Sequence, residues 1–223
     1  MKKKKGPNHE RYIKENNFYT WFWLFIMGSV AGIILEGICA LVQYGRWEYH
    51  TGTIWGPFCL IYGIGTVIVY ILSQMLQNVP FVMEFITYTI AGALVEYFGS
   101  LFQEVCFGTI SWNYSDHFLN IGGRVSLIMA LTWGVLGFLF VYVIFPPIKN
   151  LLYKLNGKLG FIVTWVLIVF MIINVTATIL TLNRWNERTN GIAASGSIDE
   201  MIDRYYNNKR MEQLFPNMYF VSK

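Results

Sequence analysis

Two glutamates stand inside long apolar runs, in the stretches AGIILE, which ends at Glu36, and AGALVE, which ends at Glu96. A charged side chain at the centre of a bilayer costs at least about 2.5 to 3.5 kcal/mol, so an intramembrane carboxylate points to a functional site. Two such groups can form a polar binding site, or act as general acid and base when their surroundings separate their pKa values. The structural alternative is a protonated glutamate that only bonds one helix to another.

Both glutamates belong to helix faces made of small residues. Residues four apart share a helix face, and small residues let helices in a membrane approach closely. The two faces consist of Gly28, Gly32, Glu36 and Ala40 in the first run, and of Gly92, Glu96, Ser100 and Glu104 in the second. We therefore predict that Glu36 and Glu96 point into a helix bundle, with Glu104 closer to its surface.

The composition requires a non-aqueous solvent for much of the chain. Of 223 residues, 55% are hydrophobic and 13% charged, whereas about a quarter of a soluble protein is charged. Runs of roughly 20 apolar residues can cross a bilayer. We predict an all-α integral membrane protein with five transmembrane helices, at about Phe18 to Leu41, Pro57 to Leu76, Phe81 to Phe107, Arg124 to Phe145 and Gly160 to Leu182.

A weak internal similarity relates the two halves of the predicted bundle. Each half reads as a helix with a glutamate, a loop rich in Trp and Tyr, and a helix with spaced glycines. This predicts a tandem parallel repeat, in which spans one and two correspond to spans three and four around an axis along the membrane normal. Glu36 and Glu96 would then lie at equivalent depths.

The distribution of Lys and Arg predicts the orientation. The arm before the first span carries six, and the loop that follows Pro146 and Pro147, where we expect the fourth span to end, carries Lys149, Lys154 and Lys158. Cytoplasmic segments are enriched in these residues, so the N-terminus should be cytoplasmic and the C-terminus extracytoplasmic. The net charge of +4 then reflects topology and implies no nucleic-acid partner.

Three regions follow from this orientation. They are a basic cytoplasmic arm (residues 1–17), a transmembrane bundle (18–183) and an extracytoplasmic tail (184–223). In the tail, Ser197 and Glu200 have the spacing of a capping box, which predicts a short helix from about Ile198 to Leu214.

The two predicted outer loops, residues 44–57 and 107–124, mix aromatic and hydrogen-bonding side chains. An interfacial belt explains the aromatic residues in part, but not the polar ones. The loop residues that we select as candidates for a polar or substrate-binding site are Trp55, Trp112, Asn113, Asn120 and Arg124. Arg124 beside a helix N-terminus could seat an anion, or it could neutralise Glu104 or Glu96.

Other chemistry finds no support in the sequence. It contains no phosphate-binding loop, no His-Glu-x-x-His pair and no Gly-x-Ser-x-Gly elbow, so no ATPase motif and no catalytic motif is present. We expect no cofactor and no metal, and whether the chain is an enzyme stays open. Cys39, Cys59 and Cys106 lack a metal-site spacing. We interpret them as small buried thiols, with a Cys39–Cys59 bridge as the alternative.

Four stretches, together with the glutamate of the first span, resemble one known family. They are WGPFCLIYGIG (55–65), EYFGSLFQE (96–104), WNYSDHFLNIGGR (112–124) and FPNM (215–218). Together they resemble the putative ABC-transporter permease family of bacterial membrane proteins, often labelled type IV, from the first span to the C-terminus. Asn113 departs from the Asp expected there.

The resemblance implies a permease subunit in the bacterial plasma membrane that needs a separate ATPase, docked on residues 147–159. In this hypothesis Glu36, Glu96 and Arg124 line an outward-opening cavity, which a homo-oligomer would enlarge. One alternative is an intramembrane enzyme that acts on a lipid-linked or amphipathic substrate. The other is a structural or sensory membrane protein whose glutamates only hold helices together.

Overall fold

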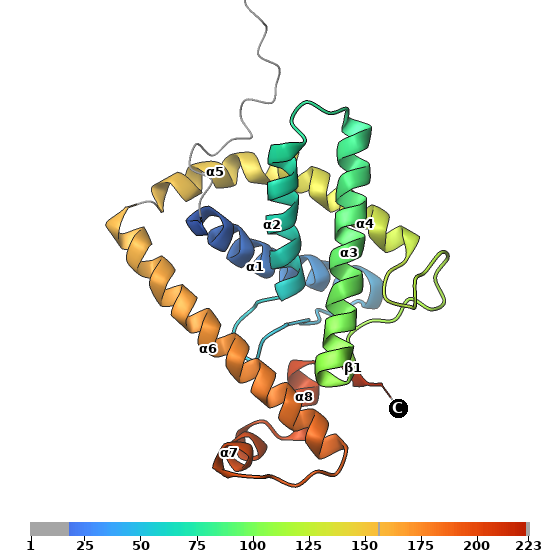
Figure 1. Cartoon of the computed structure of the whole chain (residues 1–223), viewed down its shortest axis with the longest axis vertical. Coiled ribbons are helices and arrows are strands. Elements are labelled where there is room, and N and C mark those ends of the chain that lie inside the picture. The colour runs from blue at the N-terminus through green and yellow to red at the C-terminus, as the bar shows by residue number, and fades with distance from the viewer. Residues whose placement is uncertain (1–17, 156, 222–223) are drawn as a thin grey trace, which may run out of the picture.

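The structure is a computed structural model that describes residues 18–155 and 157–221, and it is mostly helical (Figure 1). The predicted basic arm, residues 1–17, lies outside the described residues. The helices are α1 (Phe18–Tyr44), α2 (Leu60–Met75), α3 (Phe81–Phe107), α4 (Leu127–Leu139), α5 (Phe145–Lys154), α6 (Lys158–Thr189), α7 (Ser197–Tyr205) and α8 (Asn208–Leu214). A π-helical turn, η2 (Phe140–Ile144), joins α4 to α5. Two short strands, β1 (Thr109–Ile110) and β2 (Tyr219–Phe220), pair antiparallel.

Four described helical segments are long and apolar enough to cross a membrane. They are α1, α3, α6 and the continuous unit Leu127–Lys154 that contains α4, η2 and α5. The predicted second span forms α2, which has only 16 residues and is shorter than the roughly 20 that a full span needs. It begins at Leu60 rather than at Pro57, because the Phe58 C=O accepts from the Gly52 N–H and the Cys59 N–H donates to the Ser29 C=O of α1.

The fourth span also differs from the prediction, because Pro146 and Pro147 do not end it. They occupy the first turn of α5, directly after the π-helical turn. A proline in the first turn of a helix lacks only an N–H that would have no partner there. The π-helical turn that precedes α5 also shifts the hydrogen-bond register just before the two prolines. The helix therefore continues to Lys154 and carries Lys149 with it.

Small residues lie where the long helices touch. A side chain added at Gly28 would overlap Thr66 of α2, and one added at Gly32 would overlap Tyr62. One added at Gly92 on α3 would overlap Trp133 of α4. Helix α1 therefore packs closely on α2, and α3 on α4, as close approach through small residues requires. Whether these two pairs are equivalent repeats stays a prediction.

The tail folds against the C-terminal end of α6 (Figure 1). One apolar cluster joins Ile54 of the first loop, Trp185 of α6, and Met211 and Phe215 of the tail. The predicted single tail helix is wrong, since the chain breaks after Tyr205 and Asn207 caps a second helix by accepting from the Arg210 N–H.

The predicted capping box is also wrong. Gly196 precedes α7 as its N-cap and Ser197 makes no capping bond. The Asp199 carboxylate instead accepts from the backbone N–H and the hydroxyl of Ser195. An Asp in the first turn of a helix is favourable in its own right.

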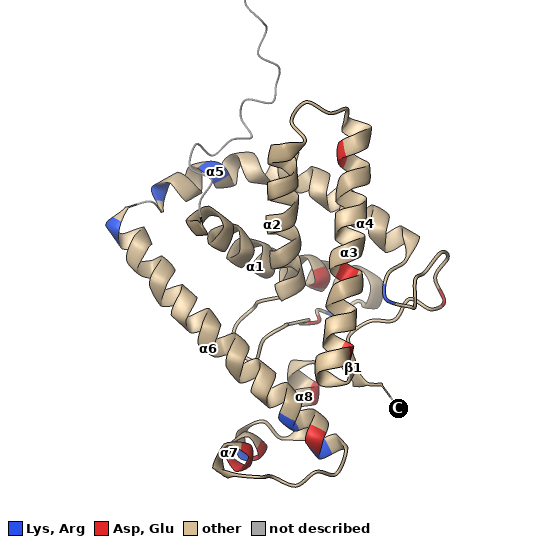
Figure 2. Cartoon of the chain, in the orientation of Figure 1, with Lys and Arg blue, Asp and Glu red and all other residues tan. Residues whose placement is uncertain are grey.

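Charged residues gather at two ends of the molecule (Figure 2). Lys149, Lys154 and Lys158 lie on α5 and at the start of α6. The tail end carries both signs, with Arg184 bonded to Glu187 and Asp203. Between these ends the ribbon is mostly uncharged and carries a few acidic and basic residues.

Candidate functional site

Two loops lie at one end of the bundle, which we call the loop end. Residues 45–59 connect α1 to α2, and residues 108–126 connect α3 to α4. These two loops supply most of the polar groups that contact the carboxylates of α1 and α3.

Glu36 of α1 is bonded to a histidine from the first loop. The distance from Glu36 Oε2 to His50 Nδ1 is 2.5 Å, and His50 Nε2 lies 3.2 Å from Glu48. Arg46 in turn pairs with Glu48 at 2.7 Å. The hydrogen bond with Glu36 raises the pKa of His50, although burial opposes the shift. Arg46, followed by His50, lowers the pKa of Glu48. The arrangement is therefore a chain of alternating charge.

Glu96 of α3 has a different environment. It is 5% exposed, and its Oε1 accepts a hydrogen bond of 3.0 Å from the Tyr114 hydroxyl. Its Oε2 is buried and has no hydrogen-bond partner among the described residues. The Trp133 indole interacts electrostatically with Glu96, but it forms no hydrogen bond with Oε2. Burial, and then the charge of Glu96, raises the pKa of Tyr114.

The two glutamates belong to one polar cluster. Glu36 interacts electrostatically with Glu96 and with Tyr114. Tyr62 of α2 interacts with Glu36 as well, and its ring stacks on Trp133 at 5.3 Å between centroids. We call Glu36, His50, Tyr62, Glu96 and Tyr114 the glutamate cluster. Whether this cluster is a functional site stays a prediction.

A second polar group surrounds Arg124, at the end of the loop that leads into α4. Its guanidinium lies 2.5 Å from Glu104 and donates to Ser100 at 3.2 Å. Of the two partners left open for Arg124, the structure selects Glu104. A cavity of about 90 Å³ opens here. We call it the arginine pocket, and it is lined by Ser100, Glu104, Ile110, Trp112, Asn113, Ser115, Gly122, Gly123 and Arg124.

The two asparagines selected from the sequence hold this second loop in shape. Asn113 Oδ1 accepts from the N–H and the hydroxyl of Ser115. Asn120 donates to two backbone carbonyls and accepts from the N–H of Gly123. Gly123 has φ 68°, which favours glycine, and a side chain there would come within 2.5 Å of Asn113. Asn113 also lines the arginine pocket, whereas Asn120 does not.

Trp112 and Trp55 occupy different places. The Trp112 indole donates to the backbone carbonyl of Arg124 at 2.8 Å and lines the arginine pocket. Trp55 lies against α6 and the tail, where its indole donates to the hydroxyl of Tyr206 at 2.9 Å. Of the eight candidates, the structure thus brings Glu36 and Glu96 to one cluster, and Glu104, Trp112, Asn113 and Arg124 to another.

The sequence pattern does not reveal the neighbours of the two glutamates. His50, Tyr62, Tyr114 and Trp133 are not among the candidates selected from the sequence. Aromatic residues are abundant in this chain, at 17%, so their types alone carry little signal. Trp133 is fixed by contacts with Gly65 and Gly92, which no local pattern reveals.

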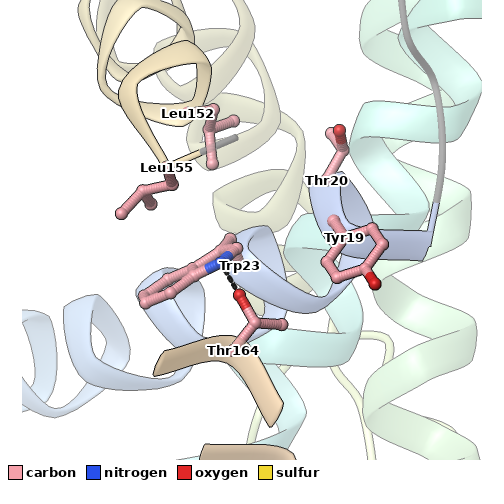
Figure 3. Close-up of a pocket in the computed structure, with 6 residues that line it drawn as sticks. All are labelled: Tyr19, Thr20, Trp23, Leu152, Leu155 and Thr164. Atoms are coloured by element: carbon pink, nitrogen blue, oxygen red, sulfur yellow. Dashed lines mark hydrogen bonds between the residues drawn. The ribbon is translucent and has the colours of Figure 1, made fainter. Parts of the chain in front are cut away.

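Another hollow, at the opposite end of α1, is too small to be a binding site. It has about 10 Å³ and is shown in Figure 3. The Trp23 indole donates to the Thr164 hydroxyl across it at 2.9 Å. Its lining contains no charged residue and consists of Tyr19, Thr20, Trp23, Leu152, Leu155 and Thr164. This hollow has room for about one water molecule.

Two further possibilities, a metal site and a disulfide bond, can be examined in the described part of the chain. No group of three or more His, Cys, Asp or Glu residues lies close enough there to hold a metal ion. All three cysteines are free, so the Cys39–Cys59 bridge does not form. Cys39 and Cys106 are exposed, which corrects the interpretation of all three as buried thiols.

Comparison with known families gives one match. The family described as "Putative ABC-transporter type IV" matches residues 23–179, from α1 into α6. The matched range contains both polar clusters and ends before the tail. No curated protein and no solved structure matches the chain.

Proposed function

The chain belongs to the putative ABC-transporter type IV family, and from this premise we propose that it is the permease subunit of a transporter whose ATPase is a separate chain. The four long apolar helices in the described part of the chain indicate a membrane protein. An ATP-binding loop is missing from the sequence, so energy from ATP would have to come from a partner. We place the protein in the bacterial plasma membrane, with the N-terminus cytoplasmic and the C-terminus extracytoplasmic. This orientation requires the short helix α2 to cross the membrane as well.

The glutamate cluster is the observation that carries this proposal. A bundle that served only as an anchor would gain nothing from burying Glu96 with one hydrogen bond and one unpartnered oxygen. Intramembrane carboxylates that face a bundle interior typically mark substrate or ion pathways. The cluster lies near the loop end, which the proposed orientation turns outward, so Glu36 and Glu96 would meet a cargo that enters from outside.

The opposite end supplies a surface for the ATPase. Lys149, Lys154 and Lys158 lie together around the turn from α5 to α6. The neighbouring Leu152 is buried against the bundle, so this segment is held in place and the lysines have a fixed support. A basic surface of this kind favours association with an acidic partner. The permease would act as a homo-oligomer, because one chain with so few spans encloses little space.

The experiment is affinity purification of the tagged full-length chain in a mild detergent, with co-purifying proteins identified by mass spectrometry. We expect a stoichiometric subunit that contains a phosphate-binding loop and hydrolyses ATP. Replacing Lys149, Lys154 and Lys158 together by glutamine should release that subunit. A chain that purifies alone or only as a homo-oligomer would contradict the proposal and favour the structural or enzymatic alternatives.

A matched control keeps the number of lost charges the same. Arg204, Lys209 and Arg210 are exposed in the tail, and their joint replacement by glutamine should leave the ATPase subunit bound. If both triple variants release it equally, the effect comes from general charge loss and the docking surface on α5 and α6 is wrong.

A further inference from the structure

We propose that Glu36 and Glu96 form a proton-binding site, in which Glu96 holds a proton while Glu36 keeps its negative charge beside His50. The ligand is the proton itself, taken from the solution at the loop end. The inference goes beyond the proposed function, because proton binding by this chain requires neither an ATPase nor a known cargo.

The surroundings of Glu96 fit a neutral acid. A buried carboxylate ion requires a paired charge or several hydrogen bonds, and without them its burial costs several kcal/mol. Glu96 is nine-tenths buried or more, accepts one hydrogen bond from Tyr114 and leaves Oε2 without a donor. None of the described salt bridges gives it a cationic partner. Adding a proton to Oε2 removes the charge that this setting does not compensate.

The surroundings of Glu36 fit a charged carboxylate. Its side chain is 27% exposed, and His50 lies 2.5 Å from its Oε2. His50 is held by Glu48 on its other nitrogen, so both of its ring nitrogens face carboxylates. This favours the doubly protonated, positive imidazole. Glu36 therefore has a cation that Glu96 lacks.

Two nearby carboxylates in unlike surroundings divide one proton unequally. A like charge disfavours ionisation of its neighbour, and Glu36 acts on Glu96 in this way. Two phenols also face the pair, Tyr62 from α2 and Tyr114 from the second loop. Both stay neutral near pH 7. The burial of Glu96 without a cationic partner is thus the main reason for its neutral form, and the negative charge of Glu36 adds to it.

Three neighbouring groups complete the surroundings. Trp133 from α4 has no titratable group. Cys59, at the start of α2, interacts with Glu36 as well and contributes a thiol. Arg124 is committed to Glu104 and Ser100, and Glu104 lies eight residues, or about 12 Å along the helix, beyond Glu96.

Infrared spectroscopy tests the protonation state directly. The full-length chain is placed in lipid nanodiscs, and the carboxylic acid C=O band is followed as the pH of the surrounding buffer is raised. We expect a band that is lost at high pH and that is missing from Glu96→Gln at every pH. Glu96→Asp keeps the acid and should shift the band rather than remove it.

Glu84 provides the matched control. It is a second buried glutamate on α3, bonded to the hydroxyl of Tyr142. Glu84→Gln should leave the band that Glu96→Gln removes. The proposal is overturned if the wild-type chain shows no titrating acid band, or if the band is the same in Glu96→Asp and the wild type. Because the assay uses this chain alone, its failure would leave the ATPase partnership untouched.

Discussion

Gly92→Ala should destabilise the contact between α3 and α4. The added methyl group would overlap the Cβ and Cγ atoms of Trp133. Trp133 cannot move aside easily, because Gly65 lies against its ring and Tyr62 stacks on it at 5.3 Å. Overpacking of a tight contact costs about 1 to 3 kcal/mol, and alanine regains about 1 kcal/mol of helix propensity over glycine. The difference is a net loss of up to about 2 kcal/mol.

Gly99→Ala is the matched control on the same helix. Its added methyl group would meet only the end of the flexible Ile61 side chain, at 3.1 Å, so the gain in helix propensity should remain. The assay is equilibrium unfolding in mixed micelles, with tryptophan fluorescence as the signal. Equal stability of the two variants, or a more stable Gly92→Ala, would refute the packing argument.

Three further predictions concern charged pairs. Glu104→Gln and Arg124→Gln should each lower the free energy of unfolding by about 1 kcal/mol, a value between those of exposed and buried ion pairs. In the same unfolding assay, the double variant should lose less stability than the sum of the two single variants. Arg184 lowers the pKa of Asp203 to about 2, so the ion pair between them stabilises the tail fully above pH 3.8, and this stabilisation is lost as the pH falls toward 2. Proteolysis of the tail should increase as the pH falls through this range in the wild type, but should not change with pH in Asp203→Asn. The pKa of His50 is raised from 6.5 in the folded chain, so the ion pairs of His50 stabilise loop 45–59 fully below pH 6.5, and this stabilisation is lost as the pH rises through the pKa of the folded state. The protection of that loop from hydrogen exchange should fall over this pH range, and His50→Gln should abolish the pH dependence.

Sequence patterns predict the long helices well where local signals mark their ends. The prediction for α3, Phe81 to Phe107, coincides with the structure. Pro80 stands before its first turn, and Gly108 ends it in the left-handed conformation, both of which are strong local signals. The start of α2 depends instead on backbone bonds of Phe58 and Cys59 to Gly52 and to Ser29 of α1, and no local pattern carries such information.

The candidate site was predictable in part for the same reason. Helical spacing placed Glu36 and Glu96 on packing faces, because the spacing depends only on the regular helix. Their partners His50 and Tyr114 come from irregular loops, whose paths depend on contacts with α6 and with the glycines of the second loop. That Arg124 pairs with Glu104 and not with Glu96 likewise depends on the path of the loop, which the sequence pattern does not reveal.

Thiol crosslinking tests the central claim, that Glu36 and Glu96 share one site inside the bundle. Cys39, Cys59 and Cys106 are first replaced by serine in the full-length chain. The pair Glu36→Cys and Glu96→Cys is then treated in native membranes with a short bifunctional thiol reagent, and crosslinking is read from a mass shift of the peptides joined.

The control pairs Glu36→Cys with Glu84→Cys, which lies 12 residues before Glu96 on α3, about 18 Å along the helix. We expect a crosslink between positions 36 and 96 and none between positions 36 and 84. No crosslink at 36 and 96, or an equal yield for the two pairs, would contradict the claim.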